Sequence, residues 1–190
     1  MQRVIARFII KPLVLIVFMT QLAFAEDGIF IKRNSLYQVD ALNNVYLLSA
    51  QIDFQLTPYL EQALMNGVVL KTGIYVGLGE YRSWWWNKTD PISTINYQLK
   101  YHALSRHFLL TRNDTNENWN YRSLPTALRS MGRIINHKLP GLSQNTLDGN
   151  HYVFMGVRLS PSTLRLPLKI QSLFSDQYSL SSEVVSWPLP

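Results

Sequence analysis

Apolar and polar residues alternate along several stretches of this chain, which is the pattern of strands that bury one face. The clearest stretch runs from Val45 to Leu56, where every second residue is apolar and those between are mostly polar. The same period recurs in residues 68–81 and 97–110, with a slip of phase near Ala103 that predicts a bulge or bend. Further strands are predicted for residues 153–159, 164–170 and 178–187.

Two short segments have the three-to-four-residue apolar spacing of amphipathic helices. Thr57 and Pro58 precede the first segment, which ends before Gly67. Ser123 and Pro125 open the second. A hydroxyl residue followed by proline is typical of a helix start. The apolar residues of the second predicted helix are Leu124, Leu128, Met131 and Ile135.

The polar segments 112–120 and 137–150 are rich in turn-forming residues, so we expect them to be connections. About seven short strands and only two helices favour a mainly β fold, an antiparallel β-sandwich with two short decorating helices. The alternative is an α+β fold with a single antiparallel sheet. A parallel doubly wound fold is disfavoured, because it needs a crossover helix between successive strands.

The first 25 residues have the features of a cleavable secretory signal peptide. Three basic residues precede an apolar run of about 13 residues, and alanines occupy positions 23 and 25. A membrane-spanning helix needs about 20 apolar residues, so we expect cleavage between Ala25 and Glu26. Residues 26–190 would then be a single β-rich periplasmic domain. The alternative is an uncleaved leader that anchors the chain in the inner membrane, facing the periplasm.

The charge of the mature domain is modest. Three of the 18 basic residues lie in the leader and none of the 12 acidic residues does, so the positive excess falls from six to three. The other basic residues are spread singly, which does not match a nucleic-acid-binding surface. The chain has no cysteine, which excludes disulfides, thiolate metal sites and cysteine nucleophiles.

No recognised catalytic or cofactor motif is present in the sequence. Gly77 and Gly79 match two positions of a dinucleotide fingerprint, but Arg82 stands at the third. We interpret these glycines as strand residues that leave room for a close neighbour or mark a bulge. The four histidines lack metal-pair spacing, and His102 and His107 would point to opposite faces of one strand. We expect no metal and no cofactor.

The acidic residues stand singly, apart from one pair at the mature N-terminus. No adjacent carboxylates therefore suggest acid–base chemistry. A pair of carboxylates brought together by the fold would leave no trace in the sequence.

The most unusual segment is a run of three tryptophans, Trp84, Trp85 and Trp86, between Arg82 and Lys88. Successive side chains of a strand point to opposite faces, so at least one ring would face solvent. Exposed rings beside basic groups can bind a sugar, lipid headgroups or a protein partner. The alternative is that the rings close the end of the hydrophobic core. These five residues are the candidate binding site.

Five longer segments follow one another after the leader: LEQALMNGVVLKTGIYV, RSWWWNK, YQLKYHALSRHFLL, SLPTALRSMG and LRLPLKI. Together they resemble a family of exported proteobacterial proteins described only as a domain of unknown function, often called proline-rich signal peptide proteins. The resemblance covers residues 54–187. It implies an association with the bacterial envelope and with a membrane sensor histidine kinase of the nitrogen-regulation type. It implies no catalytic residues.

The leading hypothesis is a non-catalytic periplasmic binding module that contacts an envelope or membrane sensor protein through the tryptophan segment. One alternative is an envelope hydrolase or carbohydrate-active enzyme whose residues meet only in the fold. Another is a peripheral or N-terminally anchored membrane protein. Nothing in the sequence indicates a nucleic-acid partner or oligomerisation.

Overall fold

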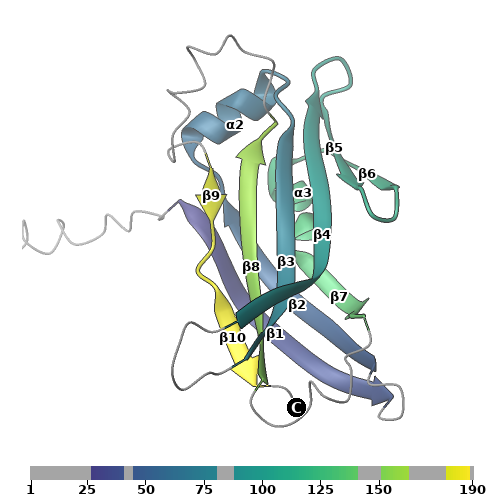
Figure 1. Cartoon of the computed structure of the whole chain (residues 1–190). Coiled ribbons are helices and arrows are strands. Elements are labelled where there is room, and N and C mark those ends of the chain that lie inside the picture. Colours follow the sequence, from purple (N-terminus) through teal and green to yellow (C-terminus); the bar gives the residue numbers. More distant parts are fainter. Residues whose placement is uncertain (1–26, 41–44, 81–87, 141–150, 163–178, 189–190) are drawn as a thin grey trace, which may run out of the picture.

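The computed structural model describes residues 27–40, 45–80, 88–140, 151–162 and 179–188 (Figure 1). The small antiparallel sheet has the order β1 (Gly28–Asp40), β2 (Val45–Gln55), β7 (Arg133–Lys138). The large antiparallel sheet has the order β10 (Val185–Pro188), β8 (His151–Pro161), β3 (Leu70–Glu80), β4 (Lys88–His102), β5 (His107–Arg112), β6 (Glu117–Tyr121), and β9 (Leu180–Ser181) pairs with β8. The helices are α2 (Pro58–Met65) and α3 (Leu124–Met131). The predicted β-sandwich-like fold with two helices is confirmed, and the strands form two sheets rather than the single sheet of the alternative.

Strand β2 has the burial pattern that its sequence predicts. Its residues at even positions from Tyr46 to Phe54 are buried, and those at odd positions are more exposed. Strand β1, which pairs with β2 over its whole length, was not predicted. A register shift between Ile31 and Arg33 interrupts the period of two in β1. The apolar residues of β1 therefore do not stay in one phase along the sequence.

Helix α2 begins at the residues that predicted it. The Oγ1 atom of Thr57 accepts a hydrogen bond from the Leu60 amide at 3.2 Å, and Pro58 is the first helical residue. Leu60 and Leu64, one turn apart, are fully buried. Gly67 ends this segment with a φ of 89°, which other residues rarely adopt. Helix α2 thus carries the chain from the small sheet to the large one.

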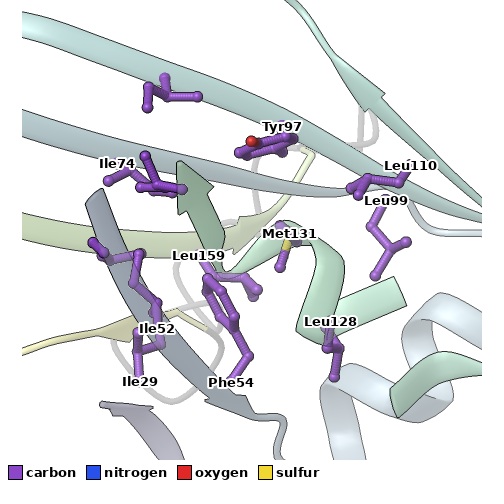
Figure 2. Packing of buried hydrophobic residues seen from close by; sticks show 14 of the residues in the cluster. Ile29, Ile52, Phe54, Ile74, Tyr97, Leu99, Leu110, Leu128, Met131 and Leu159 are labelled. Carbon is purple, nitrogen blue, oxygen red and sulfur yellow. The ribbon is translucent and has the colours of Figure 1, made fainter. Parts of the chain in front are cut away.

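The hydrophobic core lies between the two sheets, and α3 closes one side of it. Figure 2 labels Ile29, Ile52 and Phe54 from the small sheet, Ile74, Tyr97, Leu99, Leu110 and Leu159 from the large sheet, and Leu128 and Met131 from α3. Burial of one such side chain contributes about 1.5–3 kcal/mol. The core therefore outweighs any single polar contact in holding the sheets together.

Two glycines of the large sheet make room for tyrosine rings. A Cβ at Gly79 would lie 2.1 Å from the ring of Tyr152, and a Cβ at Gly156 would lie 2.2 Å from the hydroxyl oxygen of Tyr75. Each glycine is the direct cross-strand partner of the tyrosine that covers it. Gly77 lies at a register shift against β4. The interpretation of these strand glycines as room for a close neighbour or a bulge is confirmed.

Other local predictions are wrong because the chain changes structure sooner than its periodicity suggests. Helix α3 ends at Met131, and Ile135 lies on β7, where it is 58 % exposed. The segment 112–120 was expected to be a connection, but β5 ends at Arg112 and β6 begins at Glu117. The expected connection 137–150 begins inside β7.

The slip of phase near Ala103 is a hairpin turn rather than a bulge. Strand β4 ends at His102 and β5 begins at His107, and these two histidines pair across the turn. Arg106 has a φ of 53° within it. The prediction that the two histidines point to opposite faces of one strand is therefore wrong. The strand predicted for residues 164–170 lies outside the described residues.

Helix α2 and the β4–β5 turn lie at the same end of the sandwich (Figure 1). Gly28 of β1 pairs with Gln55 of β2, directly before α2. Leu70, the first residue of β3, pairs with Leu99 near the end of β4. Glu80, the last residue of β3, pairs with Lys88, the first residue of β4, at the opposite end of this strand pair.

Substitution of Gly132 tests the joint between α3 and β2. The Ile52 amide donates a hydrogen bond to the Gly132 carbonyl oxygen at 2.8 Å, and a Cβ at Gly132 would lie 2.0 Å from the Ile52 carbonyl oxygen. We expect Gly132→Ala to lower the free energy of unfolding by about 2–3 kcal/mol, measured by urea denaturation, because the two backbones must separate.

The matched control is Gly73→Ala on β3. A Cβ there would meet the Asn96 Oδ1 atom at 3.6 Å, an ordinary contact. We expect a change within about 0.5 kcal/mol. If both variants lose a similar free energy of unfolding, the close contact between Gly132 and Ile52 is not what stabilises the packing of α3 on β2.

Candidate functional site

Most of the binding site predicted from the sequence falls outside the described residues. Arg82, Trp84, Trp85 and Trp86 lie in the segment 81–87, and the expected cleavage site, Ala25 and Glu26, lies in the segment 1–26. Lys88 is the first residue of β4, and its backbone pairs with Glu80. The roles of the tryptophans as surface or core therefore stay predictions.

A groove of about 870 Å³ runs along the last residues of β2, and we call it the β2 groove. Its apolar lining comes from Phe54 and Leu56 of the β2 segment and from Leu124, Pro125 and Leu128 of α3. Helix α3 contacts β2, and its last residue, Met131, is buried in the core. The groove thus lies where the small sheet meets α3.

Three carboxylates line the same groove from three separate places in the chain. Asp27 directly precedes β1, Asp53 lies on β2 and Glu61 lies in the first turn of α2. Arg129 of α3 is the single basic residue among the described residues that line the groove. Because the carboxylates outnumber the guanidinium, the electrostatic field of the groove favours a cationic ligand.

A second group of polar side chains links the two sheets beside β7. The Nε2 atom of His137 lies 2.9 Å from the Oγ atom of Ser93 on β4, and its Nδ1 atom lies 3.4 Å from a terminal nitrogen of Arg112. Arg112 donates three hydrogen bonds to Asp114: Nε donates to Oδ1 at 2.9 Å and to Oδ2 at 3.0 Å, and a terminal nitrogen donates to Oδ2 at 2.8 Å. The guanidinium also lies 6.0 Å from the centre of the Tyr97 ring.

Burial and charge set the protonation of this cluster. Burial lowers the pKa of His137, and the positive charge of Arg112 lowers that pKa further. Burial raises the pKa of Asp114, but the hydrogen bonds from Arg112, a backbone hydrogen bond and the positive charge of Arg112 together hold that pKa below its usual value. The hydrogen bond to Asp114 also raises the pKa of Arg112. His137 is therefore neutral and Asp114 charged at neutral pH.

The hydrogen bonds of His137 determine which ring nitrogen carries the proton. A guanidinium only donates hydrogen bonds, so the Nδ1 atom that faces Arg112 is the acceptor. The proton of the neutral ring then lies on Nε2 and is donated to Ser93. A catalytic serine needs the opposite arrangement, in which histidine accepts the serine proton. An envelope hydrolase would therefore need residues other than this pair.

Sequence reasoning missed the β2 groove because its charged residues are far apart in the chain. The pairing of Gly28 with Gln55 places Asp27 at the end of β2 that carries Asp53, and both residues line the groove. Glu61 follows because α2 begins directly after β2. The alternation that predicted β2 places Asp53 on the polar face, but only the pairing of β1 with β2 shows that Asp27 lies at the same end of the small sheet. Among the residues that the structure covers, no group of three or more metal-ligating side chains occurs.

Comparisons with known proteins assign a family but no activity. A family model described as "Domain of unknown function (DUF4390)" matches residues 33–188. The resemblance to an uncharacterised family is thereby confirmed, while its implications for export and signalling stay expectations. No curated protein and no solved structure matches the chain. Neither of the described helices is long and apolar enough to cross a membrane.

Replacement of His137 should change how stability depends on pH. The unfolded chain binds a proton at the usual histidine pKa of about 6.5, whereas folded His137 binds it only at lower pH. The stability that His137 contributes should therefore be fully present above that usual pKa and fall as the pH drops below it, through the lowered pKa of the folded state. We expect His137→Gln to flatten this fall, measured as the free energy of unfolding at each pH.

The control is His102→Gln, at an exposed residue beside the β4–β5 turn. This variant should keep the slope of the original protein. If His137→Gln also keeps that slope, the interpretation of His137 as a neutral, buried partner of Ser93 is wrong.

Proposed function

We propose that this chain, which belongs to the DUF4390 family of domains of unknown function, is a non-catalytic binding module that holds a basic segment of a partner protein in the β2 groove. The observation that carries the proposal is the convergence of Asp27, Asp53 and Glu61 on a groove with an apolar lining. Binding sites typically combine an apolar lining with a few placed charged groups. Three carboxylates against one guanidinium favour a ligand that carries positive charge.

The partner that we propose is an envelope or membrane sensor protein. This proposal rests on the secretory features of residues 1–25 and on the resemblance to a family associated with sensor kinases. Linear segments of such proteins commonly bind in grooves of a folded domain. The tryptophan segment would then be a second contact or part of the core.

Charge reversal in the β2 groove tests this function. We expect Asp53→Lys and Glu61→Lys each to lower the recovery of the crosslinked partner from intact cells by about tenfold, because each replaces an attraction with a repulsion. Mass spectrometry of the crosslinked peptides measures the recovery and identifies the bound segment. The thermal midpoints of the variants should stay near that of the original protein, because both side chains are exposed.

Glu117→Lys is the matched control, since Glu117 is an exposed carboxylate on β6 and does not line the groove. It changes the net charge by the same amount and should leave the recovery unchanged. Equal recovery from all three variants would mean that the partner binds elsewhere, and the proposed role of the groove would fail.

A second candidate function is peripheral contact with an anionic membrane, and the β4–β5 turn favours it. Leu104 is fully exposed at the turn, next to the basic residue Arg106. No acidic residue occurs from residue 91 to residue 113. An exposed apolar side chain among cations is the composition of interfacial membrane contacts.

Binding to lipid vesicles tests the second candidate. We expect the protein to co-sediment with phosphatidylglycerol vesicles, and Arg106→Ser to weaken this binding about fivefold, because one basic residue near an anionic surface contributes about 1 kcal/mol. Leu104→Ser should weaken it too, whereas Ile135→Ser, an exposed apolar control on β7, should not. Equal binding to uncharged phosphatidylcholine vesicles would contradict this candidate.

A further inference from the structure

The β2 groove contains a strand edge that none of the described strands pairs with on one side. Strand β7 pairs with β2 as far as Gln51, and the Ile52 amide then bonds the Gly132 carbonyl oxygen. Beyond Ile52 no described strand continues this side of β2, whereas β1 pairs with the other side as far as Gln55. The free edge therefore begins where the groove begins.

The direction of the backbone groups follows from the bond made by Ile52. In a strand the N–H and C=O groups of every second residue point to the same side. Because the Ile52 amide points toward Gly132, the N–H and C=O groups of Phe54 point to that side as well. Phe54 also lines the groove. An extended ligand in the groove thus meets a donor and an acceptor at strand spacing.

The two faces of such a ligand would meet different surroundings. Side chains on the same face as Phe54 and Leu56 would lie toward Leu124 and Leu128 of α3. Ligand side chains on the opposite face would lie beside the carboxylate of Asp53. Residues of a strand alternate between its faces, so the fitting ligand alternates apolar and basic residues.

We propose that the β2 groove binds its partner by β-strand addition, as an extended segment with alternating apolar and basic residues that pairs with β2 at Phe54. This inference rests on the proposed function and names the partner's conformation and chemistry. Main-chain hydrogen bonds would supply affinity, and the alternating side chains would supply specificity. The pairing length is short, from Asp53 to Leu56, because Gly132 occupies the edge before it and α2 begins after it.

A pair of backbone-methylated peptides tests strand addition. The probe is the acetylated and amidated hexapeptide Val-Lys-Val-Lys-Val-Lys, titrated into the ¹⁵N-labelled protein that is purified after expression of the full-length chain. We expect the amide signals of Asp53, Phe54 and Gln55 to shift. In an extended peptide the backbone N–H groups of the valines point to one edge and those of the lysines to the other. N-methylation of all valines therefore blocks one edge, and N-methylation of all lysines blocks the other. The methylated peptide whose blocked edge faces β2 should bind about tenfold or more weakly than the unmodified peptide, and the other methylated peptide should bind as the unmodified peptide does.

The same peptide with glutamate in place of lysine is the charge control, and it should not bind. Equal binding of the lysine and glutamate peptides, or tolerance of both methylation patterns, would overturn strand addition. Shifts confined to residues outside the groove would overturn it as well. If strand addition fails while Asp53→Lys and Glu61→Lys still reduce partner recovery, the groove keeps its proposed function and only the conformation of the ligand is wrong.

Discussion

The contact between Gly132 and Ile52 determines how the small sheet ends. The Ile52 amide bonds the Gly132 carbonyl oxygen at 2.8 Å, and no side chain would fit between the two backbones. This close approach places the end of α3 against the edge of β2, so β7 begins only at Arg133. The core beneath α3 and the free edge beyond Ile52 both depend on it. A residue larger than glycine at this position would separate the helix from the sheet that it covers.

The two polar regions of the molecule differ in what their charges contact. In the cluster beside β7, Arg112 bonds Asp114, and His137 lies between Arg112 and Ser93. These groups satisfy one another and join the two sheets, so they leave little capacity for a ligand. In the β2 groove, Asp53 and Glu61 are exposed and share the lining with one guanidinium. An unbalanced set of charges on an accessible surface is the better candidate for recognition.

How far the sequence predicts this structure depends on whether the determining contacts are local. The alternation of β2 and the cap of α2 by Thr57 involve neighbours in the chain, and both were predicted correctly. Ile135 continued the apolar spacing of α3, yet it lies on β7, because the backbone turns away at Gly132 to meet Ile52. Strand β1 and the placement of Asp27 and Asp53 along one groove depend on pairing between distant residues. Such pairings have no local signal, which is why the candidate site could not be predicted.

The net charge of the chain is therefore a poor guide to its partner. The whole sequence is basic, and even without the leader it carries a positive excess, which suggests an anionic ligand. The β2 groove has the opposite sign, because Asp27, Asp53 and Glu61 line it and Arg129 is the single basic residue among its described lining. Charges on exposed surfaces are screened beyond about 8–10 Å at physiological ionic strength. A ligand held in the groove thus responds to these four residues rather than to the total, and the fold, not the composition, selects its charge.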